Sequence, residues 1–201
     1  VPGHRARTVG ARHEGIELNF DGAGHRIDFA DLVGREVMVY GQTEVTRDLM
    51  DAQILLGFEG RAYHVRDFYA SQVLSMVLGG GMSSRLFQKI REERGLCYTI
   101  FAQSGFHDDT GMLTIYAGTG AEDLADLSAL TIDEMKRAAS DMSEAEVARA
   151  KAQLRASLLM SLESTGSRAE QLASQLRVHG RVIPVEETKA KIAAVTVEQV
   201  Q

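Results

Sequence analysis

The segment of residues 78–98 constrains the fold of this chain more than any other stretch of its sequence. After Leu78 it has three consecutive glycines, Gly79 to Gly81, whose backbone can adopt positive φ and lets another segment approach closely. Ser83 and Ser84 come next, and their side-chain oxygens can accept hydrogen bonds from the free amides of a helix start. The segment therefore predicts a tight loop that opens a helix.

The second part of this segment predicts a short helix followed by a strand. Leu86, Phe87 and Ile90 recur at helical spacing, so we expect the helix to pack this face onto a sheet. Gly95 is placed to end the helix. Residues 97–101 are mostly aromatic or β-branched, which is typical of a strand.

The rest of the chain carries strand patterns first and helical patterns afterwards. A polar turn between two strand patterns, at 97–105 and 112–117, predicts a hairpin. The apolar run at 51–58 is typical of a central strand. Further strands are expected at 16–20 and 35–40, and an amphipathic helix at 64–78.

From residue 121 onward the apolar spacing is helical. A helix is expected at 122–139, and Ser143 with Glu146 fits a capping box that opens a longer one. Gly166 is expected to break or kink that helix, and Gly180 to close the next. Strands followed by helices predict an α+β fold in which helices cover an antiparallel sheet.

Composition narrows the class of protein. A hydrophobic content of 44% supports a sizeable core, and the net charge of -6 gives no basic footprint for nucleic acid. No apolar run is long enough to predict a membrane span. The single cysteine, Cys97, cannot form an internal disulfide, and its apolar surroundings predict a buried small hydrophobe.

Residues 78–98, together with 55–60 and 109–119, resemble the C-terminal half-domain of the pitrilysin and mitochondrial-processing-peptidase family of zinc metallopeptidases. The resemblance covers most of the chain from about residue 41 to residue 201. It implies that residues 35–201 form a zinc-free, inactive half-domain of a clam-shell peptidase, truncated at its C-terminal end. Residues 1–34 are expected to be a linker or a poorly defined N-terminal segment.

The resemblance also implies site residues. The family has an arginine on the helix of this run and a tyrosine seven positions later, which are Arg91 and Tyr98 here. It implies that Arg91 positions substrate and Tyr98 stabilises the oxyanion, only when a partner half is present. Taken alone, Arg91 could instead pair with Glu92 or Glu93 on the surface, and Tyr98 could simply pack the sheet. Substrate contacts are also expected at Gly79, Gly80, Gly81, Ser83 and Ser84.

Neither a metal site nor a phosphate loop is predicted within this chain. The family's other half carries an inverted H-x-x-E-H zinc helix, a pattern that is absent here, and His13-Glu14 lacks the second histidine of the related H-E-x-x-H motif. The three glycines follow a helix and lack the lysine that closes a phosphate loop. His107, Asp108 and Asp109 are typical of an exposed turn.

The resemblance to the zinc-free half of this family also implies a function. The chain is expected to be the non-catalytic half of a zinc metallopeptidase, inactive alone, with zinc held by the partner half. Its expected partners are a zinc-bearing half-domain, on the same full-length chain or on a separate subunit, and a peptide substrate. The resemblance also allows a dimer. The alternative is a catalytically silent scaffold or assembly subunit of the same family.

Overall fold

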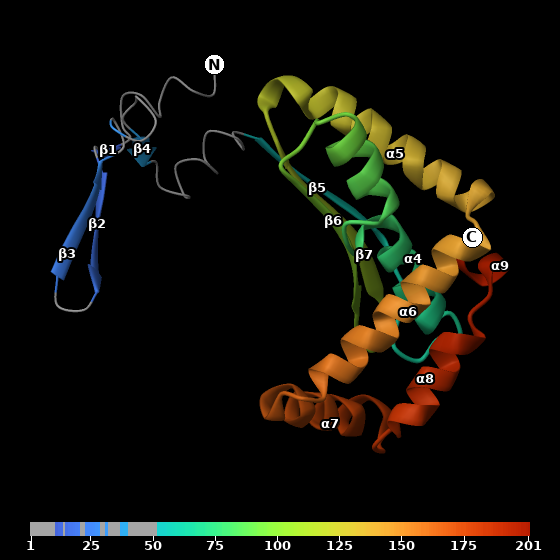
Figure 1. Ribbon diagram of the computed structural model, residues 1–201. Coiled ribbons are helices and arrows are strands. Elements are labelled where there is room, and N and C mark those ends of the chain that lie inside the picture. The colour runs from blue at the N-terminus through green and yellow to red at the C-terminus, as the bar shows by residue number, and fades with distance from the viewer. Residues whose placement is uncertain (1–10, 14, 21–22, 29–30, 32–36, 40–51) are drawn as a thin grey trace. The chain divides into compact units, whose positions relative to one another are not determined.

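The computed structural model describes residues 11–13, 15–20, 23–28, 31, 37–39 and 52–201 (Figure 1). The chain divides into two compact units, Val1–Asp51 and Ala52–Gln201. In the first unit two antiparallel pairs form, β1 (Ala11–His13) with β4 (Val37–Val39) and β2 (Gly15–Phe20) with β3 (Ala23–Asp28). The strands expected at 16–20 and 35–40 correspond to β2 and β4, although residues 35, 36 and 40 lie outside the described residues. The boundary expected after residue 34 stays a prediction.

The second unit contains a three-stranded antiparallel sheet. Its order is β5 (Ala52–Glu59), β7 (Gly111–Thr119) and β6 (Thr99–Phe106). The predicted hairpin is confirmed, because β6 and β7 pair from Phe106 opposite Gly111. The prediction of a central strand at 51–58 is wrong for the described strands, among which β5 pairs with β7 alone. Its apolar run is not enclosed on both faces, since Leu55 is 68% exposed.

Helices cover one face of this sheet. Figure 1 shows α4 next to the strands with α6 beyond it, and α4 contacts both β6 and α6. The predicted α+β class is therefore confirmed. The helices are α4 (Phe68–Gly79), η1 (Phe87–Glu93, a π-helix), η2 (Ala121–Asp123, a 3₁₀ turn), α5 (Leu124–Asp141), α6 (Glu144–Ser161), α7 (Thr165–His179), α8 (Val185–Ala194) and α9 (Val197–Val200).

The two faces of the sheet differ because strand side chains alternate. The core joins the helix-covered face of β6 and β7 to α4, and its buried side chains include Val73, Val77, Ile100, Ile115 and Ala117. The opposite face stays open within this unit, with Leu55, Phe101 and Met112 exposed. On that face the rings of Phe101 and Tyr116 stack with centroids 5.2 Å apart.

Several helix ends agree with the sequence and two do not. The capping box of Ser143 and Glu146 forms, and Gly180 ends α7 with φ of 65°. The break expected at Gly166 lies earlier. The Ser164 hydroxyl accepts a hydrogen bond from the Ser167 amide, which makes Ser164 the N-cap of α7. The helix expected from residue 64 begins at Phe68. Among the described residues, no helix has both the length and the apolar character that crossing a membrane requires.

Candidate functional site

The glycine segment begins where α4 meets β6. A Cβ added to Gly79 would lie 2.2 Å from the backbone nitrogen of Ala102, far inside van der Waals contact. The close approach of helix and strand therefore requires glycine at this position. This contact gives Gly79 a packing role that is independent of any ligand.

The next two glycines lie against side chains of α4 and α6. A Cβ on Gly80 would lie 2.1 Å from Sδ of Met76, and one on Gly81 would lie 2.7 Å from Nε2 of Gln153. The Gln153 amide donates a hydrogen bond of 3.0 Å to the Gly80 carbonyl. Gln153 on α6 therefore fixes the loop from the side away from the strands.

The two serines after the glycines take different positions. Ser84 is only 4% exposed, and its hydroxyl donates to the Gly81 carbonyl at 2.6 Å, whereas Ser83 is exposed. The Ser84 hydroxyl therefore closes the loop onto itself, and η1 has no side-chain cap hydrogen bond of the kind expected from the serines. The substrate contacts expected for the three glycines and two serines stay a prediction.

The π-helix η1 has a buried side and an outer side. Leu86 and Ile90 are completely buried, as their spacing predicts. Phe87 is only partly buried, so it packs against the edge of the core. Its ring supports the Arg91 guanidinium, whose central carbon lies 4.5 Å from the ring centroid. Of the three residues expected to form the inner face, Leu86 and Ile90 are therefore buried, whereas Phe87 lies at the edge of the core beside Arg91.

A left-handed turn brings Arg91 and Tyr98 together. Gly95 has φ of 64°, and the Leu96 amide then donates to the Ile90 carbonyl at 3.1 Å. Because the chain reverses here, Nε of Arg91 donates to the backbone carbonyl of Tyr98 at 2.9 Å. The Tyr98 amide in turn donates to the Gly118 carbonyl at 2.9 Å, which anchors this residue at the start of β6.

Both side chains of this pair remain accessible. Tyr98 is 45% exposed and the Arg91 side chain is 36% exposed. Arg91 also pairs with Glu92 at 2.8 Å, which is the surface ion pair that the sequence allowed. One ion pair uses Nη1 and one hydrogen bond uses Nε, so the guanidinium keeps further N–H donors for a ligand.

Cys97, between these two residues in sequence, is not a candidate nucleophile. It is buried, and burial raises the pKa of its thiol to about 11. The thiolate that nucleophilic chemistry needs is therefore disfavoured near neutral pH. The expectation of a buried small hydrophobe is confirmed.

Arg85 anchors the beginning of the helix that carries Arg91. Its Nε donates to Glu146 at 2.6 Å, and its guanidinium also pairs with Asp141. The hydrogen bonds from Arg85, and after them those from Ser143, hold the pKa of Glu146 at about 2, below its usual value, although burial acts in the opposite direction. The sequence indicated the capping role of Glu146 but not this pairing across 61 residues.

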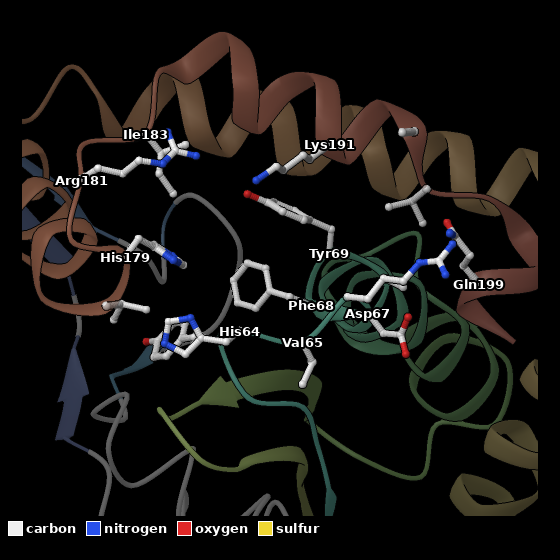
Figure 2. A pocket seen from close by; sticks show the side chains of 16 residues that line it. His64, Val65, Asp67, Phe68, Tyr69, His179, Arg181, Ile183, Lys191 and Gln199 are labelled. Carbon is white, nitrogen blue, oxygen red and sulfur yellow. The ribbon is translucent and has the colours of Figure 1, made fainter.

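A second feature is a cavity of about 600 Å³ that the sequence did not indicate (Figure 2). It lies between the loop before α4, the end of α7, and α8. His64 and His179 meet there with ring centroids 5.5 Å apart. Neither Arg91 nor Tyr98 lines it. Among the described residues, no group of three or more His, Cys, Asp or Glu could hold a metal ion.

Comparisons with known proteins agree with one another. The sequence model of a family described as "Peptidase M16 inactive domain" matches residues 30–154. An uncharacterized zinc protease of Rickettsia bellii is 38% identical over 148 residues, covering 73% of this chain and 36% of the relative. An uncharacterized zinc protease of Bacillus subtilis is 37% identical over 157 residues, covering 77% and 38%. The chain thus spans little more than a third of the length of these relatives.

Solved structures share the fold. The crystal structure of a peptidase M16 inactive domain from Pseudomonas fluorescens has a TM-score of 0.64 at 26% identity, covering 74% of this chain and 36% of that one. A chain of Complex III2 from Candida albicans, with Inz-5 bound, has a TM-score of 0.67 at 25% identity, covering 74% and 38%.

Proposed function

Because this chain belongs to the family of peptidase M16 inactive domains, we propose that it is the zinc-free half of a zinc peptidase. In this proposal it supplies substrate contacts and transition-state stabilisation to peptide hydrolysis, and a zinc-bearing half carries out the cleavage. That half is a domain of the same full-length chain or a separate subunit.

One observation carries the proposal. Arg91 and Tyr98 are joined by the hydrogen bond of 2.9 Å from Nε to the Tyr98 carbonyl, yet both side chains stay accessible. Exposed apolar side chains of this sheet, such as that of Leu55, carry no hydrogen-bonding group, whereas those of Arg91 and Tyr98 do. The turn at Gly95 and the contact with the Phe87 ring hold Arg91 beside Tyr98 at the surface.

The chemistry of peptide cleavage explains why such a pair is useful. Attack on a peptide carbonyl places negative charge on its oxygen, and a donor already in position stabilises this charge. The Tyr98 hydroxyl is the donor proposed for this role. The Arg91 guanidinium has planar, forked donors that suit carbonyl and carboxylate oxygens, so we assign it to holding the substrate.

The described residues do not fit a zinc site. The family's relatives are named zinc proteases, whereas the described part of this chain brings no three metal-ligating side chains together. A stable zinc site needs at least three protein ligands. We therefore assign the zinc to the partner half and no metal-dependent step to this one.

A second candidate function is a catalytically silent assembly subunit of the same family. The observation that favours it is the structural similarity to a chain of Complex III2 from Candida albicans. In that case Arg91 and Tyr98 would be surface residues without a substrate. The two candidates make different predictions for the same variants.

The test uses the chain joined to its zinc-bearing half. Arg91→Ala should raise KM for a peptide substrate while kcat changes less, because its proposed contact holds the substrate in both ground and transition states. Arg94→Ala is the matched control, since Arg94 is an exposed arginine three residues away. Equal kinetics for the two variants would contradict the role of Arg91 and favour the assembly subunit.

A further inference from the structure

The cavity near His64 and His179 has an apolar floor and a polar rim. Four buried apolar residues form its floor, namely Ala70, Val178, Ile183 and Val195. The rings of Phe68 and Tyr69 line its wall, and they meet edge to face with centroids 5.0 Å apart. Such a floor favours the apolar body of a ligand over water.

Basic groups gather on the rim. Figure 2 shows Lys191 beside Tyr69, with Arg181 next to them and His179 and His64 below Arg181. The Lys191 ammonium lies 5.8 Å from the centroid of the Tyr69 ring. His64 approaches His179 edge to face from the loop before α4. The rim therefore combines two cations with two imidazoles.

One carboxylate partly neutralises these cations. Glu187 Oε1 lies 2.6 Å from Nη2 of Arg181 and 2.9 Å from Nζ of Lys191. The single negative charge of Glu187 is therefore shared between two positive charges, those of Arg181 and Lys191. Lys191 has three N–H donors, and Glu187 is its one ion-pair partner in the described part of the chain. At least one donor is thus available for another anion.

The titration of His179 reflects the same positive field. Its pKa is lowered by burial and then by the charges of His64, Lys191 and Arg181, while Glu187 acts in the opposite direction. Among the described residues, Asp67 is the one carboxylate that lines the cavity, so Asp67 and Glu187 face the three cations of Arg66, Arg181 and Lys191. An anion placed at this rim is attracted by more charge than repels it.

We propose that this cavity binds a small organic anion, with its apolar body on the floor and its carboxylate or phosphate at Lys191 and the imidazoles. The inference goes beyond the proposed peptidase role, because the cavity is lined by other residues than Arg91 and Tyr98. The bound class is an amphipathic anion rather than an inorganic one, because buried apolar side chains line the cavity together with Lys191 and Arg181.

The experiment titrates the chain with 4-phenylbutyrate and follows backbone amides by NMR. Shifts are expected at cavity residues, with affinity at least about tenfold higher than for the neutral 4-phenyl-1-butanol, because a charged hydrogen bond contributes roughly this factor. Acetate, which has the charge but no apolar body, should bind more weakly than 4-phenylbutyrate. Equal affinity for the acid and the alcohol would overturn the role of charge, and absence of shifts would overturn the site.

Two lysine variants on one helix make the test specific. Lys191→Gln should weaken 4-phenylbutyrate binding about tenfold and leave the alcohol unchanged. Lys189→Gln is the control, because Lys189 pairs with Glu186 and does not line the cavity. If the two variants bind the acid equally well, Lys191 does not hold its carboxylate and the proposal is wrong. The amide spectrum of each free variant verifies that it is folded.

Discussion

The glycine loop and the Arg91–Tyr98 pair lie within one segment of 21 residues, yet they differ in what their side chains and backbone contact. Gly79 and Ser84 are buried, and their neighbours belong to the chain itself. Arg91 and Tyr98 contact each other and remain open to solvent. One run of sequence therefore contains positions that build the fold and positions whose side chains remain accessible.

The largest effect on stability is expected on the buried side of η1. Ile90 is completely buried, so Ile90→Ala should lower the free energy of unfolding by about 2–5 kcal/mol. Phe87→Ala removes a partly buried ring and should cost less, about 1–2 kcal/mol. Chemical denaturation of both variants measures the difference. A larger loss for Phe87→Ala would mean that the two sides of η1 are assigned wrongly.

The glycine loop should show the next largest effect. Gly79→Ala places a methyl group where 2.2 Å separates it from the Ala102 nitrogen, so α4 must move from β6 at a cost of about 1–3 kcal/mol. Gly166→Ala is the matched control, because Gly166 lies in the first turn of α7 and an added Cβ would make only an ordinary contact of 3.9 Å with Oγ of Ser164. That change should be neutral or stabilising. Equal unfolding free energies for the two variants would contradict the packing role of Gly79.

Lowering the pH is expected to have a smaller effect on the stability of the fold. Arg85 holds the pKa of Glu146 at about 2 in the folded chain, below the usual 4.5. The ion pair therefore stabilises the fold above about pH 4.5, and this contribution disappears as the pH falls through about 2. Because solvent surrounds the ion pair, its contribution to the free energy of unfolding is limited to about 1 kcal/mol.

Glu146→Gln isolates this contribution, because glutamine keeps the capping box but carries no charge. Stability measured from pH 5 to pH 2 should fall less steeply in the variant than in the unchanged chain. Parallel curves would show that the Arg85 pair contributes nothing measurable.

Local sequence signals predicted the parts of this fold that depend on neighbouring residues. Ser143 and Glu146 lie three residues apart, and Gly180 requires only its own backbone angle, so both helix ends were predictable. The β6–β7 hairpin likewise depends on one short turn. The pairing of Arg85 with Glu146 spans 61 residues, and no local pattern indicates it.

The misassigned features depend on tertiary surroundings. Leu55 belongs to an apolar run typical of an enclosed strand, yet helices cover only the other face of its sheet. Phe87 has core spacing, but its ring lies at the edge, where it supports Arg91. The cavity gathers His64, His179 and Lys191 from three separate parts of the chain. Spacing along a single helix or strand carries no information about such encounters.

The smallest effect on stability should accompany the largest effect on function. Tyr98→Phe keeps the ring and removes only an exposed hydroxyl, so the unfolding free energy should change by less than about 0.5 kcal/mol. In the peptidase assembled with its zinc-bearing half, the same change should lower kcat about 10²–10³-fold through loss of an oxyanion donor. Tyr116→Phe, which also removes one hydroxyl, is the control and should retain kcat.

The most direct test of the central claim is therefore the kcat of the assembled Tyr98→Phe enzyme, measured beside its unfolding free energy. The account predicts a fall of about 10²–10³-fold in kcat with an unchanged stability. A Tyr98→Phe enzyme that cleaves peptides at the unchanged rate would contradict it, and Tyr98 would then be a residue of the sheet alone.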